Sequence, residues 1–253
     1  MNNKKIIIAN WKMNPYSSEE ALRLVKGIAA VQLPKNIELI IAPPFVYLDL
    51  VKKNLAKDIK LAAQNISWAE RGAYTGEISA MMLKNIGCSH VIVGHSERRY
   101  KMGETDEIIN LKLKIALKYG FIPVLAVGEK EQNDDILKIL NVQIKSAFEG
   151  LEAPEAGRVI VAYEPVWAIS ANSAGLSDTP DHALSAALLI RKIIGNIYTP
   201  DWASDMAVLY GGSVTGDNAY DFLSQNGING ALVGAASLDL GEFFKIIKLI
   251  ESA

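Results

Sequence analysis

Eight short apolar runs recur along the chain, and they limit strongly the folds that it can adopt. Most are continuous rather than alternating, and a continuous run is typical of a strand that is covered on both faces, as in a parallel sheet. Amphipathic stretches with the period of an α-helix lie between the runs. The runs cover residues 6–9, 39–42, 61–63, 91–94, 123–127, 159–163, 207–210 and 231–234. This order predicts eight β-then-α units.

Capping residues mark the ends of two of the expected helices. Thr105 stands before an acidic pair and Gly120 follows one amphipathic stretch, while Thr179 stands before Pro180 and Gly195 follows another. Threonine is a good N-cap, proline suits the first helical turn, and glycine commonly follows a helix. We therefore expect one helix between Thr105 and Gly120 and one between Thr179 and Gly195.

The first of these helices shows a one-sided apolar pattern. Ile108, Leu111 and Ile115 recur with helical spacing, and residues 117–119 continue the stripe. We expect Lys112, with the other lysines of this stretch, to lie outside the stripe.

The length of 253 residues permits two small domains or one (β/α)8 barrel, which needs about 250 residues. No linker or low-complexity stretch separates the units. A doubly wound open sheet usually has fewer strands and a glycine-rich first turn, whereas residues 10–14 contain no glycine. We therefore predict an α/β fold, a closed (β/α)8 barrel that forms a single domain over residues 1–253.

Composition argues against several classes of partner. A net charge of -2 and a pI near 6.0 provide no basic surface for nucleic acid or an acidic membrane. The first apolar run is too short for a signal peptide or a membrane span, so we expect a cytoplasmic protein.

The single cysteine, Cys88, cannot form an intrachain disulfide. Its place before an apolar strand favours a small buried residue over the alternative, a nucleophile.

Polar residues follow the apolar runs, at the strand ends where (β/α)8 barrels carry their chemistry. Asn10 and Lys12 follow the first run and point the same way if the strand continues. A turn with a solvated lysine is the alternative.

His95 follows the fourth run. If Ser96 starts a helical turn, its N-terminal partial charge disfavours an imidazolium, and a neutral imidazole can donate a hydrogen bond to a substrate oxygen. A histidine satisfied within its loop is the alternative.

Glu164 follows the sixth run, directly before Pro165 and close to Trp167. Partial desolvation there makes a carboxylate a better proton acceptor, as a general base requires. A glutamate that is paired with a neighbouring lysine is the alternative.

Glycines follow the last two runs. Gly211 and Gly212 precede Ser213, and Gly234 precedes Ala235. Backbone N–H groups at such turns can approach an anion, and barrels commonly hold phosphate in these loops. The sequence has no cluster with metal-ligand spacing, no Ser-His-Asp arrangement and no Walker loop, so we expect neither a metal nor a cofactor. The set suits proton abstraction next to the carbonyl of a small phosphorylated substrate.

Several longer motifs stand in the order of one known enzyme family. They are residues 10–14 (NWKMN), 63–65 (AQN), 72–79 (GAYTGEIS), 93–99 (VGHSERR), 162–169 (AYEPVWAI), 210–214 (YGGSV) and 231–234 (ALVG). Together they resemble the triose-phosphate isomerase family over essentially the whole chain. The resemblance implies the TIM-barrel fold and an aldose–ketose isomerase that interconverts dihydroxyacetone phosphate and D-glyceraldehyde 3-phosphate through an enediolate, without a metal or cofactor.

The resemblance also implies roles for the matching positions. Glu164 would remove a proton from one substrate carbon and return it to the next. Neutral His95 would polarise the carbonyl and move protons between the oxygens. Lys12 would stabilise the charge of the enediolate and the phosphate, with Asn10 beside it. Glu97 would orient Lys12 by an ion pair.

Two further implications concern the phosphate and the assembly. Backbone N–H groups near Ser170, Ser213, Gly234 and Ala235 would hold the phosphate. The chain would form a homodimer in which the loop around Thr75 enters the active-site region of the partner. The residues alone would leave that loop an ordinary surface loop.

The sequence departs from the family after Ile169. The family commonly continues with Gly-Thr-Gly-Lys and soon reaches Thr-Pro, whereas here residues 170–178 read SANSAGLSD before Thr179. We expect catalysis to survive with altered lid kinetics or phosphate affinity. One alternative is a barrel enzyme for a larger phosphorylated sugar. Another is a non-catalytic scaffold, which predicts the loss of Lys12, His95 or Glu164.

Overall fold

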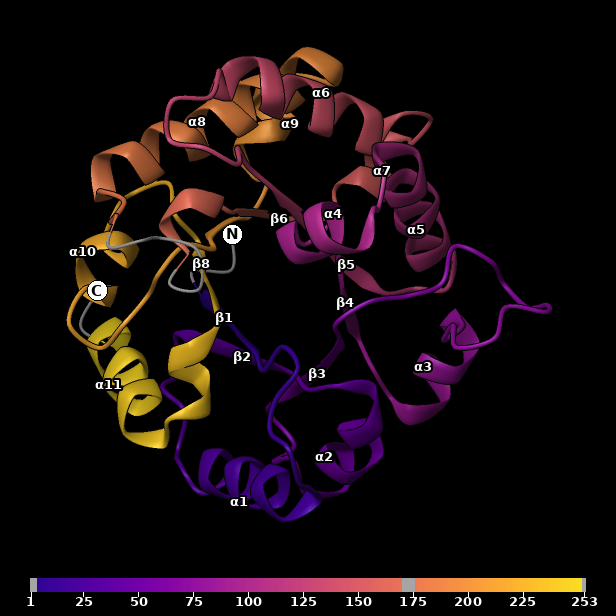
Figure 1. Ribbon diagram of the computed structural model, residues 1–253. Coiled ribbons are helices and arrows are strands. Elements are labelled where there is room, and N and C mark those ends of the chain that lie inside the picture. Colours follow the sequence, from indigo (N-terminus) through magenta and orange to yellow (C-terminus); the bar gives the residue numbers. More distant parts are fainter. Residues whose placement is uncertain (1–3, 170–175, 252–253) are drawn as a thin grey trace.

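The computed structural model describes residues 4–169 and 176–251, in which eight parallel strands close into a barrel in chain order (Figure 1). The strands are β1 (Lys5–Asn10), β2 (Ile37–Ala42), β3 (Lys60–Ala63), β4 (His90–Val93), β5 (Ile122–Val127), β6 (Ile160–Tyr163), β7 (Val208–Tyr210) and β8 (Gly230–Val233). Closure comes from the pairing of β8 with β1, which runs from Ile6 opposite Gly230 to Ala9 opposite Val233. The predicted (β/α)8 barrel is confirmed, and the open sheet is excluded.

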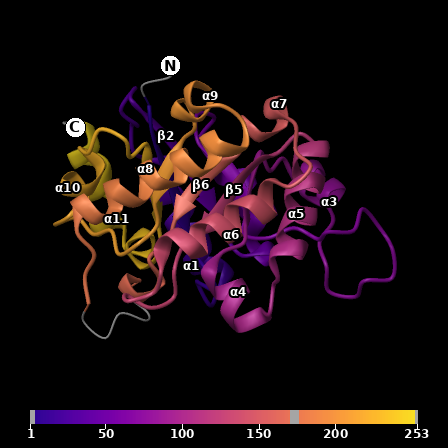
Figure 2. The same cartoon turned by 90° about the horizontal axis from the view of Figure 1, so that it is seen from above.

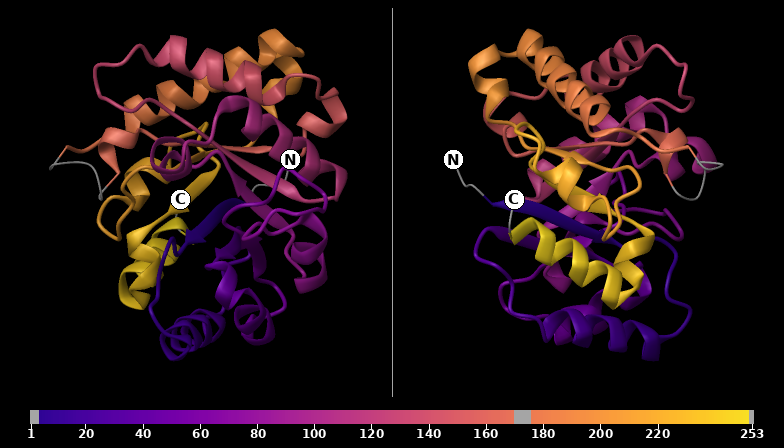
Figure 3. Two further views of the ribbon diagram at one scale, coloured as in Figure 1. Left: turned by 45° about the vertical axis from the view of Figure 1, so that its right-hand side comes forward. Right: turned by 90° about the vertical axis from the view of Figure 1, so that its left-hand side faces the viewer.

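Helices form a ring around the strands (Figure 1). They are α1 (Ser18–Ala29), α2 (Leu48–Asn54), α3 (Ala80–Ile86), α4 (Ser96–Met102), α5 (Asp106–Lys118), α6 (Ile136–Phe148), α7 (Ala153–Ala156), α8 (Pro180–Ile197), α9 (Pro200–Ser204), α10 (Ala219–Leu223) and α11 (Leu240–Glu251), with short 3-10 turns η1 (Phe45–Tyr47), η2 (Val166–Ala168) and η3 (Ala235–Leu238). The last long helix, α11, packs beside α1 and so closes the ring (Figure 3). No helix in the described ranges is long and apolar enough to cross a membrane.

The strands bury both of their faces. One set of side chains fills the inside of the barrel: Ile8, Ile40, Ala42, Ala62, Ile92, Val124, Ile160, Ala162, Leu209 and Leu232. The residues between them point outward and pack under the helices in a second, larger core. Because water reaches neither face, nearly every strand position is apolar, which explains why the runs are continuous.

The capping residues predict helix starts better than helix ends. Thr105 caps α5 and Thr179 caps α8, each with its side chain accepting a backbone N–H of the first turn. Gly120 follows α5 in a left-handed conformation, with φ of 74°. The end predicted at Gly195 is wrong, because α8 continues to Ile197. A Cβ at Gly195 would lie 3.2 Å from Cα of Pro200, so this glycine lets α9 pack closely.

The predicted stripe of α5 is also wrong in part. Leu111 is 47% exposed, whereas the side chain of Lys112 is only 1% exposed. The ammonium of Lys112 donates to Oδ1 of Asn65 at 2.7 Å and pairs with the carboxylate of Glu104. A buried charge is tolerated when it is paired and hydrogen-bonded, so these contacts explain why a lysine takes a place in the interior.

The two ends of the barrel differ. Helix α4 lies at one end and α9 at the opposite end, while the loop of residues 64–79 projects from the side (Figure 2). Cys88 is buried two residues before β4, as expected for a packing residue. Burial raises the pKa of its thiol to about 12, so it remains a thiol at neutral pH.

His90, on β4, makes the stability of the fold dependent on pH. Its ring is buried, with Nδ1 2.8 Å from Oγ of Ser89. Burial, and then the charge of Lys60, lower the pKa of His90 from 6.5 to about 4. Between these values the unfolded chain binds a proton that the folded chain does not. We therefore expect stability to be lost as the pH falls from 6.5 towards 4, by up to about 3 kcal/mol.

Denaturant unfolding of the wild type and of His90→Gln between pH 4 and 7 measures this effect. Other groups titrate equally in both proteins, so the difference between their pH slopes isolates His90. The variant should lose less stability on acidification, and identical slopes would contradict the assignment.

Candidate active site

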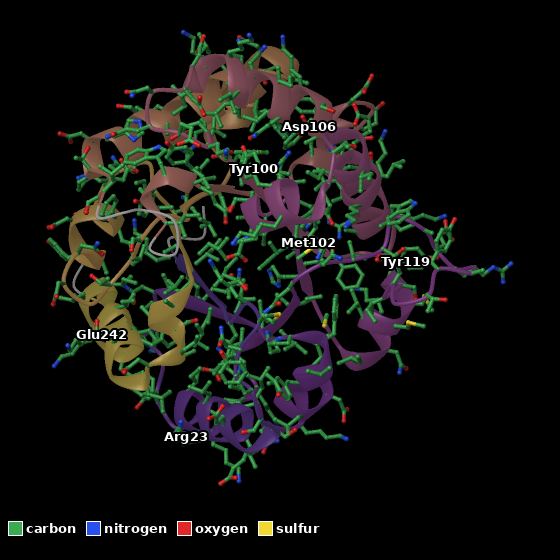
Figure 4. All side chains as sticks on the ribbon, viewed as in Figure 1. Arg23, Tyr100, Met102, Asp106, Tyr119 and Glu242 are labelled. Carbon is green, nitrogen blue, oxygen red and sulfur yellow. The ribbon has the colours of Figure 1, made fainter. Side chains whose placement is uncertain are left out.

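A pocket of about 480 Å³ opens at the carboxyl ends of the strands. Its lining includes Lys12, His95 and Glu164, which come from three different strand ends, together with the glycine turns after β7 and β8. A second pocket of about 260 Å³ shares Lys12 and His95 with the first. Glu242, on α11, lines the first pocket and Met102, on α4, lines the second (Figure 4).

His95 is the N-cap of α4, so the helix start expected at Ser96 is confirmed. Nδ1 of His95 accepts the backbone N–H of Glu97 at 3.2 Å. A ring nitrogen that accepts a hydrogen bond carries no proton, so the proton of a neutral imidazole must be on Nε2. Nε2 in turn lies 3.1 Å from Oε1 of Glu164. The end of β4 therefore directs the proton-bearing nitrogen at the carboxylate that follows β6.

Glu164 is 2% exposed and is held on both its backbone and its side chain. Its N–H donates to the carbonyl of Val127 at 2.8 Å, and its second carboxylate oxygen, Oε2, accepts the N–H of Ser96 at 2.9 Å. A Cβ at Gly211 would lie 2.9 Å from Cγ of Glu164. The absence of a side chain at Gly211 thus leaves the room that the carboxylate needs.

Lys12 has a strained backbone. Its φ of 52° is the only positive value among the non-glycine residues that the structure describes. Oδ1 of Asn10 accepts its N–H at 3.0 Å, and Nε2 of Gln64 donates to its carbonyl at 2.8 Å. These two contacts, one to the N–H and one to the carbonyl of Lys12, hold its backbone in the left-handed conformation. The side chain is 22% exposed, so the alternative of a freely solvated lysine does not describe it.

The expected partner of Lys12 is present. Nζ of Lys12 lies 2.9 Å from Oε1 of Glu97. Burial of Glu97 acts to raise the pKa of its carboxyl, but the charge and hydrogen bond of Lys12 outweigh burial and hold that pKa below its usual value. Glu97 is therefore ionised at neutral pH and keeps the ammonium beside the pocket.

The turns after β7 and β8 supply the remaining polar surface. Ser213, Gly234 and Ala235 all line the first pocket, and the 3-10 turn η3 begins at Ala235. The position of Ala235 is compatible with a side chain, because its φ is not positive. Lys12 packs against the second turn, where a Cβ at Gly234 would lie 3.3 Å from its Cε. One ammonium and two backbone turns thus border one cavity. Ser170 lies outside the described residues.

Three supporting residues were missed by the sequence analysis. Glu129 accepts the hydroxyl of Tyr163 at 2.9 Å and the indole N–H of Trp167 at 2.6 Å, so it supports both sides of Glu164. Gln64 and the N–H of Ser96 hold Lys12 and Glu164, as described above. Gln64 directly follows β3 and Glu129 stands two residues after β5, so the strand-end rule that selected the other residues would have selected them too.

Comparisons with known proteins agree with this geometry. Residues 5–250 match the family model described as Triosephosphate isomerase. The triosephosphate isomerase of Dictyoglomus thermophilum is 44% identical over 97% of this chain and 99% of its own length. Those of Geobacter metallireducens and Aquifex aeolicus are each 42% identical over 96% of this chain and 97% and 98% of their own lengths. The chain belongs to the triosephosphate isomerase family.

Proposed function

We propose that this chain interconverts dihydroxyacetone phosphate and D-glyceraldehyde 3-phosphate through an enediolate, with Glu164 as base and neutral His95 as acid. Family membership supports the reaction. The observation that carries the residue assignment is the 3.1 Å separation of Nε2 of His95 and Oε1 of Glu164 in a pocket that Lys12 also lines. A non-catalytic scaffold predicts the loss of one of these three residues, and all three are present.

The proton transfers follow from the geometry of these side chains. The carboxylate of Glu164 releases the N–H of Ser96, takes a proton from the carbon next to the carbonyl and returns it to the neighbouring carbon. His95 donates its Nε2 proton to the carbonyl oxygen and passes protons between the two oxygens. The backbone N–H of Glu97 occupies Nδ1 of His95, so a neutral ring presents its one proton from Nε2, on the side of Glu164.

Charge stabilisation falls to Lys12 and the glycine turns. The ammonium of Lys12 lies beside Gly234 and stabilises the negative charge of the enediolate and of the phosphate. Asn10 and Glu97 position Lys12, one through its backbone and the other through its side chain. Backbone N–H groups near Ser213, Gly234 and Ala235 bind the phosphate. Ser170 remains a predicted fourth contributor.

We also propose a homodimer, in a cytoplasmic location that suits the unpaired Cys88. Several apolar side chains are exposed, among them Met13, Val46, Tyr74 and Met102. Tyr74 lies on the loop of residues 64–79, Met13 and Met102 line the second pocket, and Val46 lies on a segment beside that pocket. The tip of the loop, with Thr75 exposed, projects from the barrel (Figure 2). The loop of one subunit would fill the second pocket of the other and cover this apolar surface.

Removing the base tests the proposed reaction. Glu164→Gln keeps the size of the side chain and removes its proton affinity, so we expect kcat to fall about 10³-fold with a much smaller change in KM. A coupled assay of triose-phosphate turnover measures both constants. Glu131→Gln, at an exposed glutamate, serves as the matched control and should retain wild-type rates. A wild type as slow as Glu164→Gln would reject the proposal.

Charging the projecting loop tests the homodimer. Thr75→Arg would place a cation in the contact with the partner, so we expect a mass near twice that of the 27.5 kDa chain to fall to that of one chain. Light scattering after gel filtration measures the mass. Ser224→Arg, at an exposed residue of the helical ring, should leave the dimer intact. A wild type that runs as a single chain would contradict the proposal.

A further inference from the structure

Asp178 stands where the chain enters α8, and its side chain is almost completely buried. Its side chain is 1% exposed, although the neighbouring Ser177 and Thr179 are exposed. It belongs to the stretch in which the sequence departs from the family pattern, directly before Thr179. A carboxylate is costly to bury unless charged or polar partners surround it, so its neighbours indicate what it does.

The first partner is His182, one turn into α8. Its Nδ1 lies 2.7 Å from Oδ1 of Asp178, and the same oxygen accepts the N–H of Thr179 at 2.7 Å. The imidazole ring lies between Asp178 and two aromatic rings of the β6 end, with centroid distances of 5.8 Å to Trp167 and 6.2 Å to Tyr163. His182 is thus positioned by Asp178 on one side and packs against these rings on the other.

Oδ2, the other carboxylate oxygen of Asp178, is buried and has no hydrogen-bond partner among the described residues. Burial, and then the charge of Asp178, raise the pKa of the phenol of Tyr210, at the end of β7. The contacts that hold Asp178 are therefore those of Oδ1, with His182 and with the N–H of Thr179.

The rings that pack on His182 belong to residues beside the proposed base. Tyr163 precedes Glu164 in the sequence, Trp167 follows it by three positions, and both donate to Oε1 of Glu129. Asp178 itself is not among the residues that line the first pocket.

We propose that Asp178 is a positioning residue for the isomerisation, which through His182 holds the rings beside Glu164. The inference rests on the proposed function and adds a residue to it. A desolvated carboxylate is stable only while its partners stay in place, so the burial of the Asp178 side chain favours a single arrangement of β6 and α8. Small displacements of reacting groups reduce rates steeply, which makes such a restraint matter for catalysis.

A double-mutant cycle tests this role. Asp178→Asn keeps the shape of the side chain and removes its charge, and His182→Gln removes the ring that packs on Tyr163 and Trp167. Each should lower kcat about tenfold, while KM for the triose phosphate and Kd for inorganic phosphate stay near their wild-type values. The double variant should show no further fall in kcat.

Asp181→Asn is the matched control, since Asp181 is an exposed acid three residues along the same turn. It should leave kcat, KM and the phosphate Kd unchanged. Calorimetric titration with inorganic phosphate needs no turnover, so a wild type that binds phosphate without isomerising triose phosphates would reject the proposed function alone.

The positioning role itself is overturned by either of two results. In the first, Asp178→Asn lowers the melting temperature while kcat, KM and the phosphate Kd stay at wild-type values. In the second, the paired substitutions add. If Asp178→Asn does not fold, His182→Gln decides: a wild-type kcat in this variant would equally overturn it.

Discussion

The closure of the sheet by β8 on β1 is the constraint on which the rest of the structure depends. In a closed parallel barrel every strand ends at the same rim, so residues that are far apart in the sequence meet there without any special loop. Lys12 follows β1, His95 follows β4 and Glu164 follows β6, yet all three line one pocket. An open sheet with the same strands would spread these side chains along an edge.

Convergence at one rim places many polar groups where water is scarce, and each then needs a partner. Glu97 pairs with Lys12, the N–H of Ser96 with Glu164, and Glu129 with Tyr163 and Trp167. Away from the pocket the same requirement brings Lys112 to Glu104 and Asn65. The positive φ of Lys12 is tolerated for a related reason, because fixed hydrogen bonds on either side of the residue hold it.

Sequence alone predicts those features that depend on neighbours in the chain. The strands follow from apolar runs, the starts of α5 and α8 from their threonine caps, and the rim residues from their place after each run. The failures depend on distant contacts. Lys112 can be buried because Asn65, 47 positions away, accepts a hydrogen bond from its ammonium. Gly195 packs against the next helix, α9, and does not end α8. Glu129 and Gln64 could have been found by the same rim argument, whereas the N–H of Ser96 could not, because every residue but proline has one.

Two histidines lie five positions apart on β4 and the turn that follows it, and they meet different surroundings. His90 sits within the barrel among groups that take no part in the pocket, while His95 faces the rim. Acid tolerance of the folded chain can therefore change by substitution at one end of a strand without disturbing the imidazole at the other. In a lineage that moves to a more acidic habitat, substitution of His90 on β4 can therefore change the stability of the fold while the proposed catalytic groups stay the same.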